Sequence, residues 1–127
     1  MAVTLGQDAL EGALDMKEAI DLLESACAHE AMGRAYLSPK YINNFEAGAM
    51  RMLFAADYEA GYSATKTYQN VSGFGARFIV TLYSLRNGDV LAMLDGRPIT
   101  DLRTGAASGV IGRRVSVKAP VTVGVLG

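Results

Sequence analysis

Residues 78–94 are the feature that most restricts how this chain can fold. Two runs rich in β-branched and aromatic residues, 78–85 and 90–94, flank a short polar segment that contains Asn87 and Gly88. An Asn-Gly pair readily adopts the backbone angles of a tight turn between antiparallel strands. The segment therefore predicts a β-hairpin, and a β-sheet must be part of the fold.

Two further runs are predicted to be strands. Residues 49–55 place large apolar side chains at alternate positions, which is typical of a strand buried on at least one face. In the second run, 62–68, Lys66 shares a strand face with aromatic and small residues, namely Tyr62, Ala64 and Tyr68. Such a lysine either extends its ammonium group to water or is held by an anion, and the sequence leaves both interpretations open.

A helix is predicted from Asp15 to about Gly33. Asp15 followed by Glu18 is the signature of a capping box, and apolar residues recur after it at helical spacing. Cys27 falls on the apolar stripe, so we expect it to be an inert core residue. His29 lies near the helix end, and no partner for triad or metal chemistry is evident.

The segment 94–112 contains the strongest candidate site. A turn and Pro98 precede a predicted short helix whose first turn carries Arg103 and Thr104. Unpaired amides at a helix start, with a guanidinium beside them, favour a carboxylate or a phosphate. The small residues 105–109 allow a ligand or a second backbone to approach closely. The alternative is that this helix simply packs tightly against a sheet, with Arg103 on the surface.

Composition narrows the class of protein. The 127 residues suit one folded domain, and 12 basic residues scattered among 13 acidic ones argue against a nucleic-acid partner. With a single cysteine and a single histidine, we expect neither a disulfide framework nor a metal site. No apolar run is long enough to span a membrane and no signal peptide opens the sequence, so we expect a cytoplasmic protein without membrane contact.

The end of the chain, 121–126, is predicted to be a strand buried on both faces. Nothing follows that could cover such a strand, which indicates that a second domain is missing. The competing interpretation is a stand-alone domain that uses this run as a last internal strand.

Several motifs carry a family resemblance when they are taken in order. They are Asp-Met-Lys-Glu-Ala-Ile, a strand-borne Lys66 followed by Asn70, the Asn-Gly-Asp hairpin, Leu-Ala-Met-Leu-Asp-Gly, Ile-Thr-Asp-Leu-Arg-Thr-Gly-Ala-Ala-Ser and a final Val-Gly-Val-Leu-Gly. This series is similar to the N-terminal part of the ornithine cyclodeaminase and mu-crystallin family. The run from Leu94 to Ser108 is its most specific piece.

The resemblance implies an α+β fold, with a mixed, partly open-barrel-like β-sheet and flanking helices. Residues 1–120 would form a substrate-binding and dimerisation domain. Residues 121–127 would begin a truncated Rossmann domain, with Gly127 as the first glycine of its Gly-x-Gly fingerprint.

Site residues follow from the same resemblance. Lys66 and Arg103 match the residues that bind the substrate carboxylate, and Arg103 and Thr104 would also lie near the nicotinamide. Lys40 stands close to the place of a second substrate-binding arginine, although it lacks the bidentate fork. Gly75 falls near the place of a threonine beside the cofactor, which weakens a specific assignment to ornithine deamination.

The implied function is hydride transfer between NAD or NADP and the α-carbon of an amino or cyclic imino acid. Cyclodeaminases, imine reductases and amino acid dehydrogenases are the expected reaction types. The cofactor would be bound mainly by the missing domain, which would also hold the acid/base aspartate, so the fragment alone should be inactive and contain no catalytic residue. Partners would be a small carboxylate substrate and a second copy of the chain. The alternative is a non-enzymatic, mu-crystallin-like binding protein or a stand-alone dimerisation module.

Overall fold

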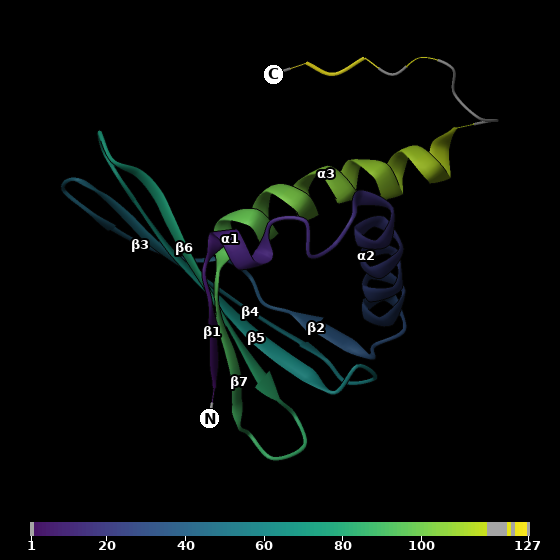
Figure 1. The fold of residues 1–127 in the computed structure, drawn as a ribbon, viewed down its shortest axis with the longest axis horizontal. Helices are drawn as coiled ribbons and strands as arrows, with labels where there is room; N and C mark the ends of the chain where they lie inside the picture. Colours follow the sequence, from purple (N-terminus) through teal and green to yellow (C-terminus); the bar gives the residue numbers. More distant parts are fainter. Residues whose placement is uncertain (1, 117–121, 123, 127) are drawn as a thin grey trace.

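A β-sheet forms the base of the structure, which is a computed structural model that describes residues 2–116, 122 and 124–126 (Figure 1). Within these residues the sheet has seven strands, and their order is β1-β7-β6-β5-β4-β2, with β3 also pairing with β4. All pairs are antiparallel except β1 with β7. The strands are β1 (Val3–Leu5), β2 (Ala35–Leu37), β3 (Tyr41–Phe45), β4 (Gly48–Asp57), β5 (Tyr62–Val71), β6 (Gly75–Ser84) and β7 (Val90–Asp95).

Three ten-residue strands, β4, β5 and β6, make up the centre of the sheet. The predicted hairpin is confirmed as β6 and β7, and Gly88 in their connection has a positive φ of 78°. The predicted strand at 62–68 is confirmed and extends to Val71. Strand β5 therefore has a hydrogen-bonded neighbour on each side, which fixes its backbone register in the sheet.

The helices are α1 (Gln7–Leu10), α2 (Met16–Ala31) and α3 (Gly96–Val115), and the expected α+β class is confirmed. Helix α2 begins at the predicted capping box. The Glu18 amide donates to Asp15 Oδ1 at 2.8 Å, and the Asp15 amide donates to Glu18 Oε2 at 3.0 Å. The helix ends just before Gly33, whose φ is 70°.

Helix α3 begins earlier than predicted. Asp95 is its N-cap and accepts a hydrogen bond of 2.8 Å from the Arg97 amide. Pro98 lies inside the first turn, where a helix needs no amide donor. Arg103 is therefore seven residues into the helix, about 10 Å from its start. The expectation that Arg103 accompanies unpaired amides in the first turn is wrong.

The small residues of α3 pack against α2. A methyl group added to Gly105 would lie 2.9 Å from the end of the Met16 side chain, and one added to Gly109 would meet Ile20. Ala106, between them, is fully buried. Close packing, the alternative that the sequence left open, therefore explains this run, but the partner is a helix rather than the sheet.

Ion pairs join the same two helices at the end of α3. Arg113 donates to Asp21 at 2.6 Å and to Glu24 at 2.9 Å, and Arg114 Nε donates to Glu24 at 2.6 Å. Arg113 and Lys17 hold the pKa of Asp21 below its ordinary value through these hydrogen bonds. The contact between α2 and α3 is therefore stabilised by ion pairs as well as by the close packing of small residues.

The C-terminal part of α2 is attached to the turn after β4. His29 Nδ1 lies 2.8 Å from Asp57 Oδ2, and His29 Nε2 lies 3.2 Å from Glu59 Oε2. Backbone donation from Ala60, followed by the contact with His29, lowers the pKa of Asp57. His29 thus has partners that are 28 and 30 positions away and that the sequence did not suggest. Cys27, expected in the core, is exposed, and it lines an open hollow between α2 and the sheet.

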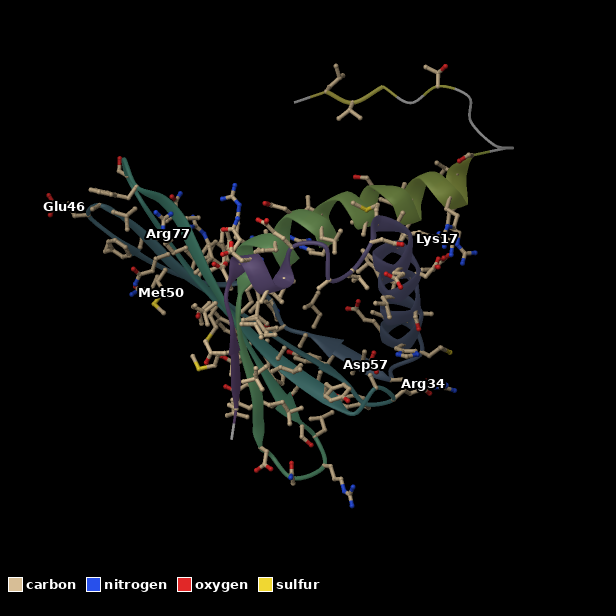
Figure 2. All side chains as sticks on the ribbon, viewed as in Figure 1. Lys17, Arg34, Glu46, Met50, Asp57 and Arg77 are labelled. Atoms are coloured by element: carbon tan, nitrogen blue, oxygen red, sulfur yellow. The ribbon has the colours of Figure 1, made fainter. Side chains whose placement is uncertain are left out.

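The two faces of the sheet differ in what covers them. Helices α2 and α3 lie on one side, and Met50 lies on the other (Figures 1 and 2). The predicted strand at 49–55 is confirmed within β4, but its large alternate side chains lie on this outer face, where 44% of Met52 is exposed. The face carries a group of exposed apolar side chains, which we call the outer apolar face: Tyr41, Met50, Met52, Phe54, Ile79 and Met93.

We predict that Ala106→Leu destabilises the protein by about 1–3 kcal/mol, because the larger side chain must force α2 and α3 apart. Gly112→Ala, in the same helix, is the matched control. A methyl group at Gly112 meets no atom within 4 Å, so this change should stabilise the helix by about 0.5–1 kcal/mol. Urea unfolding measures both effects, and a neutral Ala106→Leu would show that the helices do not pack this closely.

Candidate functional site

A cavity of about 490 Å³ lies between the sheet and the two long helices. Its walls come from α2, α3, β2, β4 and β5, together with the segment before β3. Three residues that the sequence singled out, Lys40, Lys66 and Arg103, line it together. We call it the cationic cavity.

Lys66 lines the cavity from β5. In the sheet it pairs with Leu53 of β4 and Val80 of β6. Its ammonium donates to Thr100 Oγ1 at 2.6 Å and lies 4.9 Å from the centre of the Phe78 ring. The ammonium is thus held against a hydroxyl and an aromatic face, although one of the two interpretations had it extending to water.

The surroundings of Lys66 disfavour the charged form of its side chain. Partial burial, followed by the positive charges of Arg103 and Lys40, lowers the pKa of Lys66, and Asp101 acts in the opposite direction. Within the described residues no carboxylate forms an ion pair with any of the three cations. An anion in this cavity would relieve their mutual repulsion.

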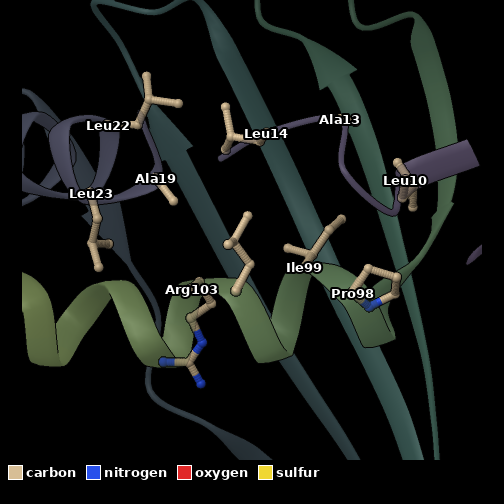
Figure 3. A pocket seen from close by; sticks show the side chains of 10 residues that line it. Leu10, Ala13, Leu14, Ala19, Leu22, Leu23, Pro98, Ile99 and Arg103 are labelled. Carbon is tan, nitrogen blue, oxygen red and sulfur yellow. The ribbon is translucent and has the colours of Figure 1, made fainter. Parts of the chain in front are cut away.

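Arg103 approaches the cavity from α3. Figure 3 shows its guanidinium pointing away from Leu14 and Ile99, which line a neighbouring apolar hollow of about 350 Å³ beside α1 that Arg103 also borders. Thr100, one turn earlier, accepts the hydrogen bond from Lys66 and donates its own proton to the Gly96 carbonyl oxygen. Helix α3 therefore supplies both a partner for Lys66 and a second cation.

Ser38 positions the segment that carries Lys40. The buried Ser38 hydroxyl accepts from the Phe54 amide at 2.9 Å and donates to the Pro39 carbonyl oxygen at 2.9 Å. The Ser38 amide donates to the Phe54 carbonyl oxygen at 2.8 Å. Sequence reasoning missed this serine, and the only available signal was its place just before a proline.

The structure does not bring the other expected residues into the cavity. Thr104 is exposed, and its hydroxyl donates to the Thr100 carbonyl oxygen at 2.6 Å. Gly75 begins β6, five residues before Val80, so it lies about 17 Å along the strand from the row that contains Lys66. Gly127, like residues 117–121 and 123 of the expected final strand, lies outside the described residues.

Residues 2–127 match the ornithine cyclodeaminase/mu-crystallin family. The chain belongs to this family. An alanine dehydrogenase of Archaeoglobus fulgidus is 30% identical over 97% of this chain and 39% of its own length. A solved archaeal alanine dehydrogenase dimer with bound NAD has a TM-score of 0.82 and 30% identity, over 88% of this chain and 36% of that one.

A second solved relative is the Δ1-pyrroline-2-carboxylate reductase of Thermococcus litoralis, in complex with NADH and L-proline. It has a TM-score of 0.82 and 26% identity, over 87% of this chain and 37% of that chain. The chain thus spans less than two fifths of the length of these relatives. The family therefore includes enzymes of amino and imino acids whose structures contain NAD or NADH.

The described part of this family member does not fit the pyrophosphate of such a dinucleotide. Helix N-termini are the usual pyrophosphate sites, but acidic residues cap both long helices here. Asp15 and Glu18 occupy the start of α2, and Asp95 occupies the start of α3. These carboxylates would repel phosphate groups.

Two further observations concern the described residues. None of their helices is long and apolar enough to cross a membrane. They also contain no cluster of three histidine, cysteine or acidic side chains placed to hold a metal ion.

We predict that Lys66→Met leaves the free energy of unfolding at pH 7 unchanged or higher. The lowered pKa means that the unfolded chain binds more protons than the folded one between the folded and unfolded pKa values. Wild-type stability should therefore rise with pH through that interval, and the variant should lack this rise. Methionine also packs well against the rings of Tyr68 and Phe78.

Urea unfolding at several pH values tests this prediction, with Lys17→Met as the control. Lys17 is exposed and forms a surface pair with Asp21, so its loss should change stability little. A loss of more than about 1 kcal/mol in Lys66→Met would show that the hydrogen bond to Thr100 serves the fold rather than a ligand.

Proposed function

We propose that the cationic cavity binds the carboxylate of a small amino or cyclic imino acid. The observation that carries this proposal is the convergence of Lys66, Arg103 and Lys40, none of which pairs with a carboxylate of the described residues. A carboxylate ligand supplies the missing negative charge. Arg103 can grip both of its oxygens, and Lys66 acts as a point charge beneath them.

We further propose that these residues are the substrate-binding part of a longer NAD(P)-dependent enzyme. Support comes from relatives that are more than twice as long and that include an alanine dehydrogenase and an imine reductase. The nicotinamide would exchange a hydride with the α-carbon. The dinucleotide would be bound chiefly outside the described residues, because their helix N-termini carry acidic caps. The 127 residues alone should then lack turnover.

The part played by this chain is orientation. Two cations at fixed positions on a strand and a helix hold the carboxylate in one pose, and the attached α-carbon is then restricted to a small region above the sheet. Lys66 is fixed by Thr100 and by its place in β5, so little conformational entropy is lost when the ligand binds.

We predict that Lys66→Ala and Arg103→Ala each weaken binding of L-alanine or L-proline at least tenfold. Arg97→Ala is the matched control, because Arg97 lies on the same helix, is exposed and pairs with Asp101 outside the cavity. Calorimetric titration of the full-length protein measures affinity, and NAD(P)H absorbance measures turnover. Equal affinity in wild type and both variants would overturn the carboxylate site. Binding without turnover would favour the non-enzymatic alternative.

We also propose that the outer apolar face forms a homodimer interface. It lies on the side of the sheet opposite the helices, and 45% of Ile79 and 45% of Met93 are exposed. An uncovered apolar sheet face is costly in water, and the same face of a second copy would cover it symmetrically. An alanine dehydrogenase relative is a dimer, which supports this assignment.

The dimer proposal predicts that Met52→Glu or Ile79→Glu produces a monomer. Each change places a charge at the centre of the apolar contact, where it would be desolvated without a partner. Ile111→Glu is the control, because Ile111 is exposed on α3 rather than on the sheet. Sedimentation velocity distinguishes the two states, and a wild-type monomer would contradict the proposal.

A further inference from the structure

A second hollow adjoins the cationic cavity. It measures about 410 Å³ and lies between α2 and strands β2, β4, β5 and β6. Four residues line both spaces: Leu23, Leu37, Ala55 and Ala64. The two spaces therefore meet where the sheet presents two alanines and where α2 and β2 each present a leucine. We call the second space the alanine hollow.

The strand register shows how far the alanine hollow lies from the cations. Ala64 pairs with Ala55 on one side and with Leu82 on the other. This row is two residues along β5 from Lys66, which is about 7 Å. The row contains only aliphatic side chains, and methyl groups at two of its three positions leave space above the sheet.

Polar side chains return one row farther on. Tyr62 pairs there with Asp57, about 13 Å along β5 from Lys66. Asp57 is already engaged by His29 and by the amides of the following turn. Glu30, the other carboxylate that lines the hollow, adjoins His29 at this end of α2.

We propose that the alanine hollow receives the side chain of the substrate and selects an aliphatic chain over one that ends in an amino group. This inference rests on the proposed carboxylate site, because that site anchors the other end of the ligand. It assigns the ligand class to α-amino or imino acids with an apolar side chain of about two to four carbons.

Ligand length supports this selection. In ornithine or lysine, five or six single bonds of about 1.5 Å separate the carboxyl carbon from the terminal nitrogen, a span of roughly 6–8 Å. With the carboxylate at Lys66, that nitrogen reaches the row of Ala55, Ala64 and Leu82 and stops one row short of Asp57. A cation there loses water and gains no partner, whereas a methylene group gains affinity by burial.

The test is a ligand series measured on the full-length protein by titration. The series is L-alanine, L-2-aminobutyrate, L-norvaline and L-norleucine, with L-ornithine and L-lysine as the amino-terminated counterparts. We expect affinity to rise by up to about fourfold for each methylene carbon added from alanine to norvaline. Ornithine should bind at least tenfold more weakly than norvaline.

Two variants change the hollow in opposite directions. Ala64→Leu fills it and should abolish the gain in affinity from alanine to norvaline. Leu82→Ala enlarges it and should extend the gain to norleucine. Ala28→Leu is the matched control, because Ala28 is exposed on α2 and lines neither space. If Ala64→Leu does not fold, Leu82→Ala still tests the proposal.

The outcomes separate this inference from the function on which it rests. If no ligand binds, or if Lys66→Ala leaves binding intact, the carboxylate site itself is wrong. Two results would overturn only the proposed role of the alanine hollow. In the first, L-alanine binds in a Lys66-dependent way but affinity does not change along the series; in the second, ornithine binds more tightly than norvaline. A rising series that Ala64→Leu abolishes and Ala28→Leu preserves supports the proposal.

Discussion

The positive charge around Lys66 is the constraint on which the rest of this structure depends. An ammonium on the middle strand of a sheet loses water, and Arg103 and Lys40 add repulsion. One hydroxyl and two aromatic rings partly offset that cost. No carboxylate of the described chain pairs with these cations. The arrangement therefore favours the binding of an anionic ligand but lowers the stability of the ligand-free protein, which is a common cost of binding sites.

Stability has to come from elsewhere, and the structure shows two sources. Three long antiparallel strands hold Lys66 in register from both sides. Small residues of α3 fit against α2, and Arg113 and Arg114 pair with acidic residues of α2. These contacts hold Thr100 and Arg103 at a fixed distance from the sheet. The uncovered outer apolar face suggests a third source, which is contact with a second copy.

Local signals in the sequence predicted much of this architecture. The capping box of α2 and the Asn-Gly hairpin depend on contacts between near neighbours, so both were found. The short strands β1, β2 and β3 were not, because three to five residues carry too little periodicity and each strand is defined by its partner. The start of α3 was misplaced because Pro98 suits either a turn or a first helical turn. Cys27 was expected in the core because periodicity identifies an apolar face without showing how much of it a neighbour covers.

The sequence by itself determined the family, the helix and hairpin, and the face of β5 on which Lys66 lies, since strand alternation leaves no other choice. Only the tertiary structure decided that Lys66, Arg103 and Lys40 share one cavity, that Arg103 is far from its helix start, and that Gly75 and Thr104 lie outside the cavity. It alone showed two alanines leaving a hollow beside the cations. These are distances between residues remote in the chain, and they depend on strand register and helix crossing, which no local pattern encodes.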